Sequence, residues 1–339
     1  MAEPNLFAYL DHNVLDLITK GDPDRVVDLL KRWALIPVFS NENLAEIRRS
    51  IGHEQSFLEL LDRIKARHLV PALDASFKHT GGAEIRQVSP FEAYNTYKDN
   101  AYPLPPLGFG LSGMLQKFYG GRQNQTFAEI FSKGADELLV LLKTAEDALQ
   151  EVPGLDDHTR ATLSGFFGDL PGMMREQYHS FAAQIDADPN AFVKQLEQAS
   201  GLEPKVLKNI GGPDVLRKIW KLVENRYPGV AGNFETFFGI KPFPFDMDAG
   251  RERTMLEKVN GIYHQLNFLG YYRDSQMSRQ RRFVASFSDM THAGLATFCH
   301  VLICRDEDLV MKAAAAYEYV NVRTRILYYG ANTPIEPRI

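Results

Sequence analysis

The chain has 339 residues, of which 45% are hydrophobic and 24% charged, and this balance excludes a disordered chain or a coiled coil. The net charge of −5 argues against a wholly basic surface for binding nucleic acid but permits a local basic patch. Two cysteines, Cys299 and Cys304, are too few for a disulfide framework or a four-cysteine zinc site, which indicates a reducing compartment. No secretory leader or long apolar run is visible, so we expect a cytoplasmic protein that does not enter a membrane.

The first part of the chain alternates between strand and helix patterns. The apolar run before Asp11 is typical of a buried strand, and the 3.6-residue spacing of apolar side chains such as Val26, Leu30 and Trp33 predicts an amphipathic helix. Ser40 or Asn41 can cap the next helix. The predicted order is strand 6–10, helix 24–34, strand 35–39, helix 40–50, helix 54–67 and strand 68–73.

The middle of the chain has a different pattern. Residues 100–113 are rich in proline and glycine, which predicts a loop. Residues 126–227 have helical periodicity with no strand pattern, and a second proline-containing loop over 239–245 precedes a helix over 255–268.

The α/β pattern then resumes, with a helix over 282–298, a strand ending at Cys304, a helix over 307–319 and a strand over 324–329. Because the two ends of the chain share one style, we predict a single three-layer α/β domain with a mainly parallel sheet. A helical insertion interrupts it. The predicted parts are 1–75 for the first half of the domain, 76–254 for the insertion and 255–339 for the second half.

Four acidic residues stand where such a fold would bring them together. Asp11 and Asp306 each follow a predicted strand, and the carboxyl ends of parallel strands form the ligand-binding edge of an open sheet. Glu46 lies in the predicted helix 40–50, and Asp289 lies in the predicted helix 282–298, which precedes the strand that ends at Cys304. Converging carboxylates repel one another unless a cation compensates, so the pattern predicts a site for Mg²⁺ or Mn²⁺.

These segments resemble the PIN domain, a family of metal-dependent nucleases. The resemblance covers roughly 5–73 and 283–330, less than half of the chain. The matching segments are Leu10-Asp11-His12-Asn13-Val14 for the opening strand, Ser40 to Glu46 for the second helix, Asp289 to Ala293 for the late helix, and Cys304-Arg305-Asp306-Glu307-Asp308-Leu309 for the final motif. Cys304 replaces the usual hydroxyl residue and Leu309 the usual aromatic, and the long insertion is not an ordinary part of the family's domain.

The resemblance implies metal-dependent hydrolysis of phosphodiester bonds, with RNA favoured over DNA as substrate. It assigns catalysis and metal binding to Asp11, Glu46, Asp289 and Asp306, with Asp308 as a fifth metal ligand. We expect Asn13 and Ser40 to hold the carboxylates in orientation. A divalent cation would activate water and neutralise charge on the phosphate.

A basic run is the best candidate for contact with nucleic acid. Arg279, Arg281 and Arg282 offer paired donors to phosphate, and nearby aromatic residues could stack on bases. The same run could instead be a solvated helix face. The helical insertion could bind a protein partner or a second copy of the chain.

Other interpretations stay open. Each acid, taken alone, could cap a helix or face solvent. His12 and His292 lie beside ligand positions and could assist proton transfer, although packing is the commoner role. The main alternative function is a non-catalytic PIN-like scaffold whose insertion binds a protein, and a weaker one is a dehalogenase-type phosphatase that would depend on Asp246.

Overall fold

The computed structural model describes residues 5–21, 23–75, 78–100, 119–150, 204–226, 232–242 and 250–329, together with isolated positions between 113 and 187. Its contacts divide the chain into two compact units. The first comprises Met1–Asn100, Ala199–Asp274 and Ala285–Ile339, and the second comprises Ala101–Gln198 and Ser275–Val284. The contacts therefore group residues 76–100 and 199–254 with the two ends of the chain, whereas the predicted insertion spans 76–254.

The first unit is built on a six-stranded sheet with the order β4-β3-β2-β1-β5-β6. All neighbouring strands are parallel except β3 and β4. The strands are β1 (Leu6–Leu10), β2 (Leu35–Ser40), β3 (Arg67–Leu73), β4 (His79–Arg86), β5 (Val301–Cys304) and β6 (Arg325–Tyr328). From β1 the chain adds β2, β3 and β4 in turn on one side, and it later adds β5 and β6 on the other side. The direction of strand addition therefore reverses between β1 and β5. In open parallel sheets this switch point is the usual place for a ligand.

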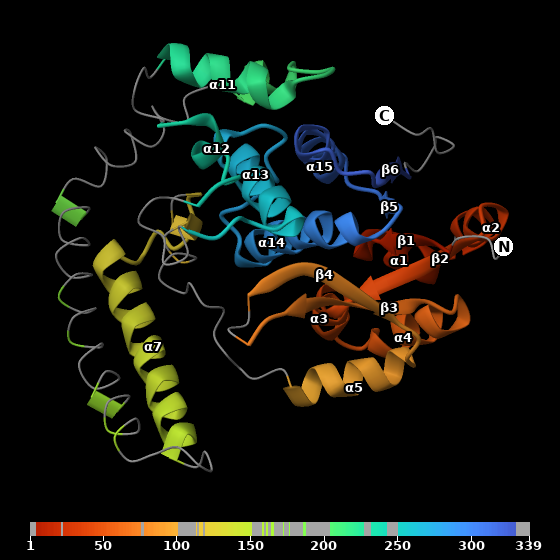
Figure 1. The fold of residues 1–339 in the computed structure, drawn as a ribbon, viewed down its shortest axis with the longest axis horizontal. Coiled ribbons are helices and arrows are strands. Elements are labelled where there is room, and N and C mark those ends of the chain that lie inside the picture. Colours follow the sequence, from red (N-terminus) through yellow and green to blue (C-terminus); the bar gives the residue numbers. More distant parts are fainter. Residues whose placement is uncertain are drawn as a thin grey trace. The chain divides into compact units, whose positions relative to one another are not determined.

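Helices cover both faces of this sheet, which gives the predicted three-layer α/β architecture (Figure 1). Side chains alternate along β1, so that Ala8 and Leu10 join the core on one face and Tyr9 joins the core on the other. The first core includes side chains from α1 (His12–Thr19), α2 (Pro23–Arg32), α3 (Asn41–Arg49), α4 (Glu54–Arg63) and α5 (Pro90–Asn100). The second core includes side chains from α10 (Pro204–Lys208), α11 (Val215–Arg226), α13 (Met255–Leu269), α14 (Gln280–Leu295) and α15 (Glu307–Val320).

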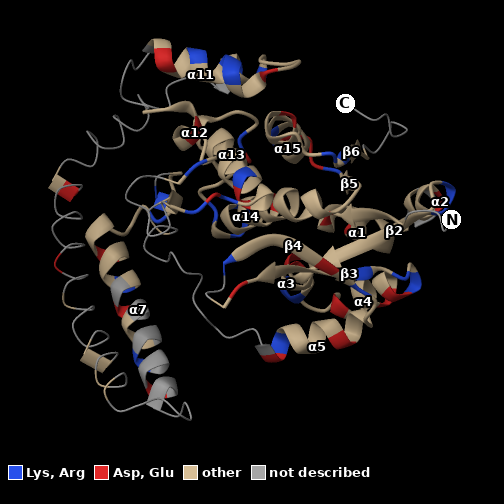
Figure 2. Cartoon of the chain, in the orientation of Figure 1, with Lys and Arg blue, Asp and Glu red and all other residues tan. Residues whose placement is uncertain are grey.

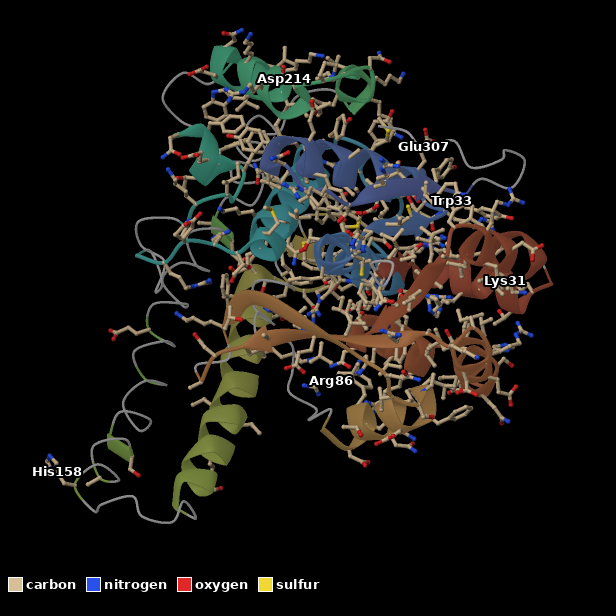
Figure 3. The ribbon with its side chains drawn as sticks, turned by 45° about the vertical axis from the view of Figure 1, so that its right-hand side comes forward. Lys31, Trp33, Arg86, His158, Asp214 and Glu307 are labelled. Atoms are coloured by element: carbon tan, nitrogen blue, oxygen red, sulfur yellow. The ribbon has the colours of Figure 1, made fainter. Side chains whose placement is uncertain are left out.

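Local sequence explains most of the element boundaries. Ser40 ends β2 and caps α3, where its hydroxyl accepts from Glu42 N and the Asn43 side chain accepts from Ser40 N. Helix α2 ends at Arg32, so Trp33 falls outside it and is 41% exposed (Figure 3). The predicted apolar stripe of that helix therefore stops at Leu30.

Strand β4 and helix α5 lie in a region that the sequence pattern assigned to the helical insertion. The strand carries two glycines and no run of alternating apolar residues, and most of its side chains are at least partly exposed. It pairs antiparallel with β3 at the edge of the sheet, so it has a strand neighbour on one side only. Such an edge strand lacks the alternating apolar residues by which a strand is recognised in a sequence.

The second unit contains α7 (Phe127–Gln150), within the region of predicted helical periodicity. The side chain of Asp186 accepts from the backbone N–H groups of Phe127 and Ala128 at 3.0 and 2.8 Å, which satisfies two donors at the start of the helix. Phe127, Ile130 and Phe131 are buried. Across the described parts of both units, no helix is long and apolar enough to cross a membrane.

A close backbone approach within the first unit gives a testable result. A Cβ atom added to Gly261 in α13 would lie 2.5 Å from the carbonyl oxygen of Gly239. We therefore expect Gly261→Ala to lower the free energy of unfolding by about 1–3 kcal/mol, because helix and loop must move apart. Chemical denaturation measures this. Gly211→Ala is the control, since its Cβ would meet nothing within 4 Å, and an equal loss in both variants would contradict the interpretation.

Candidate metal centre

Asp11 occupies the central position of the candidate site. It directly follows β1, its backbone N–H donates to Ile303 O of β5 at 3.0 Å, and its side chain is fully buried. Neither carboxylate oxygen has a well-formed hydrogen bond to any described residue, although the Asn13 side chain lies near enough to lower the pKa somewhat. Burial, with help from Glu46 and Asp306, raises the pKa of Asp11 to about 6 against the opposing effect of His292. The carboxylate is thus costly to bury as it stands.

Glu46 belongs to a chain of hydrogen bonds that links four elements. Its Oε2 lies 2.8 Å from His292 Nε2, and His292 Nδ1 lies 2.8 Å from the Tyr9 hydroxyl. Tyr9 in turn bonds the Ser40 hydroxyl at 2.7 Å. The chain therefore runs from the end of β2, through β1 and α14, to α3. Ser40 is connected to Glu46 only indirectly, through Tyr9 and His292.

His292 provides a fixed positive charge within this chain. Burial alone would lower its pKa, but Glu46, Asp11 and Glu42 outweigh that effect and raise the pKa to about 9. With both ring nitrogens protonated, Nε2 donates to Glu46 and Nδ1 donates to Tyr9. The Nε2 atom is also 3.9 Å from Asp11 Oδ1. His292 is therefore a structural cation between two of the predicted metal ligands.

Asp289 and Asp306 share the electrostatic field of Asp11. Burial, followed by Asp11, Asp274 and Asp306, raises the pKa of Asp289 well above its usual value. Asp306 follows β5 and caps α15, where its Oδ1 accepts from Leu309 N at 3.0 Å. Its capping role was one of the alternatives, and it leaves the second carboxylate oxygen for another partner. Glu307, the next residue, is exposed at the start of α15 (Figure 3).

Asp308 was predicted as a fifth metal ligand and Asn13 as a residue that orients the carboxylates. Asp308 is partly buried, and its Oδ1 is 3.8 Å from Lys208 Nζ. Burial and Asp306 raise the pKa of Asp308 against the effect of Lys208. Asn13 is exposed in the first turn of α1, beside Asp11.

The donor chemistry suits Mg²⁺ or Mn²⁺. Asp11 is buried with two unused oxygens, and it and Asp306 both raise the pKa of Asp289, as expected for carboxylates that lack a compensating cation. In the conformation described, however, no group of three or more His, Cys, Asp or Glu side chains has the spacing of a formed metal site within the described residues. The residues are chemically suited to a divalent cation, and their side chains would need to move to coordinate it.

The predicted nucleic-acid contacts belong to the second unit. Arg279, Arg281 and Arg282 are all exposed and lie within the segment Ser275–Val284. Their exposure is compatible with either of the roles considered for them. Asp246, on which the phosphatase alternative depends, lies outside the described residues.

Several residues of the site escaped the sequence analysis. Tyr9 looked like an ordinary core residue of the first strand, and 283 positions separate it from His292. A second polar cluster contains Lys312, Asp274 and Tyr263, which occur in no recognisable motif. A lysine within the otherwise apolar stretch of α15 was the one available signal.

Comparisons of the chain with models of protein families, with curated proteins and with solved structures found no match.

Proposed function

We propose that this chain is a metal-dependent nuclease that hydrolyses phosphodiester bonds with Mg²⁺ or Mn²⁺, and that RNA is favoured over DNA as substrate. The observation that carries the proposal is the state of Asp11. Asp11 is a fully buried carboxylate at the switch point of a parallel sheet, and its two oxygens have no hydrogen bond to a described residue. His292, 3.9 Å from Oδ1, offsets only part of the cost of burial, so a bound cation would stabilise the carboxylate. The preference for RNA follows from the resemblance to PIN domains alone.

Each acidic residue has a distinct task in this proposal. Asp11 and Asp289 would hold the cation, and Asp306 would add its free oxygen while its other oxygen keeps α15 in place. Glu46 would be held in orientation by its hydrogen bond to His292. When bound, the cation supplies activation of a water molecule and neutralises charge on the scissile phosphate.

Exposed basic residues on two helices of the same unit support a polyanionic substrate. Helix α11 has several basic positions (Figure 2), and its exposed basic residues are Arg217, Lys218 and Lys221. Helix α10 carries exposed Lys205 and Lys208. Lys208 approaches Asp308, two residues from Asp306. These side chains supply positive charge within the unit that contains the acids, despite the negative net charge of the chain.

The second candidate function is a scaffold without catalytic activity. The observation that favours it is the lack, among residues the structure describes, of three side chains already arranged to hold a metal. In that case the second unit would serve to bind a protein partner or another copy of the chain.

Cleavage of matched oligonucleotides separates the two functions. Labelled single-stranded RNA and DNA of one sequence are incubated with the purified protein in Mn²⁺ or in EDTA. The nuclease proposal expects cleavage in Mn²⁺ only, with loss of activity in Asp11→Asn and Asp306→Asn purified in the same way. Activity that persists unchanged in these variants would refute the metal site, and no cleavage by the native protein would favour the scaffold.

A further inference from the structure

A fully buried lysine lies in the second core of the first unit. Lys312 projects from α15, and its ammonium group donates to Asp274 Oδ1 at 2.7 Å and to Asn267 Oδ1 at 3.1 Å. It also lies 4.6 Å from the ring centroid of Tyr263. Asn267 is itself fixed, because it donates to Ser286 and accepts from the backbone N–H of Asp274. Lysine is almost never fully buried without such partners, so these contacts explain how the ammonium group is held in the core.

Two polar atoms of this cluster are left over. Asp274 Oδ2 and the Tyr263 hydroxyl are buried, and neither has a hydrogen-bond partner within the described parts of the chain. Tyr263 is fully buried. Buried polar groups in proteins normally find partners, so two unused atoms beside one lysine point to a missing occupant.

The cluster shares the electrostatic field of the candidate metal centre. Burial raises the pKa of Tyr263, and Asp274, Asp289, Asp306 and Asp11 raise it further. Asp274 also raises the pKa of Asp289. Lys312 and Asp274 both act on Asp308. Charges of the candidate metal centre therefore act on Tyr263, and Asp274 and Lys312 act on acids of that centre in return.

We propose that Asp274 is a further oxygen donor of the metal centre, and that Lys312 and Asn267 are positioning residues that hold its Oδ1 so that Oδ2 faces the cation. This inference rests on the proposed function, since it adds a donor to the same centre. Lys312 occupies one oxygen of Asp274 and offsets its charge, while the other oxygen stays available. The Tyr263 hydroxyl is placed to donate a hydrogen bond within the same acidic field.

The alternative is that Lys312 and Asp274 form a structural ion pair only. Replacing both partners of a buried pair by neutral groups of similar shape is often close to neutral for stability, whereas removing one partner leaves an uncompensated charge. The double variant Lys312→Met with Asp274→Asn therefore removes the carboxylate without the penalty of a lone buried charge. A merely structural pair predicts that this variant binds metal as the native chain does.

The experiment measures Mn²⁺ affinity of the full-length, metal-free chain by isothermal titration calorimetry, with no substrate present. The matched control is the double variant Lys20→Met with Asp16→Asn, which removes an ion pair of the same 2.7 Å length on the surface of α1. We expect the Lys312/Asp274 variant to bind Mn²⁺ at least about tenfold more weakly and the control to bind unchanged. Circular dichroism in EDTA confirms that each variant is folded.

The outcomes are distinct. Equal affinity in the native chain and the Lys312/Asp274 variant overturns the role of Asp274 and leaves the proposed function standing. Absence of Mn²⁺ binding by the native chain overturns the proposed function, and the added ligand with it. If the double variant fails to fold, Lys312→Gln with Asp274→Asn replaces it, because two amides keep a hydrogen bond without leaving a lone buried charge.

Discussion

Asp11→Asn should abolish metal-dependent cleavage and, at the same time, make the metal-free protein more stable. The side chain is fully buried and its carboxylate oxygens lack hydrogen bonds within the described residues, so an uncharged amide is less costly to bury than the carboxylate. We expect a loss of at least about a thousandfold in cleavage rate. The free energy of unfolding in EDTA should rise by about 2 kcal/mol at pH 8.

The pH dependence of this gain has a definite sign. The pKa of Asp11 is raised from 3.8 to about 6 in the folded protein, so the folded state holds a proton that the unfolded state has released between these values. The native chain therefore loses stability as pH rises through about 6. The advantage of the variant should be present at pH 8 and should disappear near pH 4.

The control for Asp11→Asn is Asp306→Asn. Asparagine caps a helix about as well as aspartate, so this variant should lose cleavage while its stability in EDTA stays within about 0.5 kcal/mol of the native value. Thermal melts in EDTA at the two pH values measure stability, and the oligonucleotide cleavage assay measures the loss of activity. If Asp11→Asn destabilised the metal-free chain at pH 8, the view that His292 compensates the buried carboxylate of Asp11 only in part would be wrong.

His292→Asn should remove a large part of the stability that the metal-free protein has at neutral pH. The imidazolium faces Glu46 of α3, Asp11 after β1, Glu42 and the Tyr9 hydroxyl. Without it, Glu46 loses its hydrogen-bond donor in a largely buried position. We expect a loss of about 2–3 kcal/mol at pH 6.

The pH profile identifies the cause. Because the pKa of His292 is raised from 6.5 to about 9, its contribution is fully present below pH 6.5 and is lost as pH rises through about 9. Native protein in EDTA should thus lose stability between pH 7 and pH 10, and the variant should lose much less. A variant profile parallel to the native one would show that His292 is not charged in the folded state.

A histidine on β3 supplies the matched control. Burial and Arg86 lower the pKa of His68 to about 4, and its Nε2 lies 2.9 Å from Asn41 Oδ1. His68→Asn should therefore change the pH dependence of the free energy of unfolding only between about pH 4 and pH 6.5. In this range the unfolded state binds a proton at His68 and the folded state does not. It should leave the range from pH 7 to pH 10 unaltered.

The alternation of strand and helix at the two ends of the chain was readable from sequence because each element there has strong periodicity. Strands β1, β2 and β5 are short apolar runs bounded by polar residues, and α15 begins directly after a capping aspartate. The positions of Asp11 and Asp306 at one sheet edge follow from that reading alone. Strand β4 could not be found in this way because exposed, glycine-containing edge strands have no apolar alternation.

The extent of the insertion was beyond the reach of pattern analysis for a different reason. The apolar stripe of α11 packs in the same core as β1 and α15, whereas the sequence shows only that the stripe must be buried somewhere. A helix that covers a sheet and a helix in a separate bundle have the same periodicity. The contact between Tyr9 and His292 was invisible for a related reason, since hydrogen bonds across 283 positions leave no local trace.

The strand order has a consequence for how the protein is made. Strand β1 leaves the ribosome first, but one of its two partners in the sheet, β5, is synthesised almost 300 residues later. Until then one flank of β1 lacks its native strand, so the nascent chain must keep an apolar edge from pairing with the wrong neighbour. Because Asp306 follows β5, the four predicted ligands Asp11, Glu46, Asp289 and Asp306 cannot come together before β5 has been made.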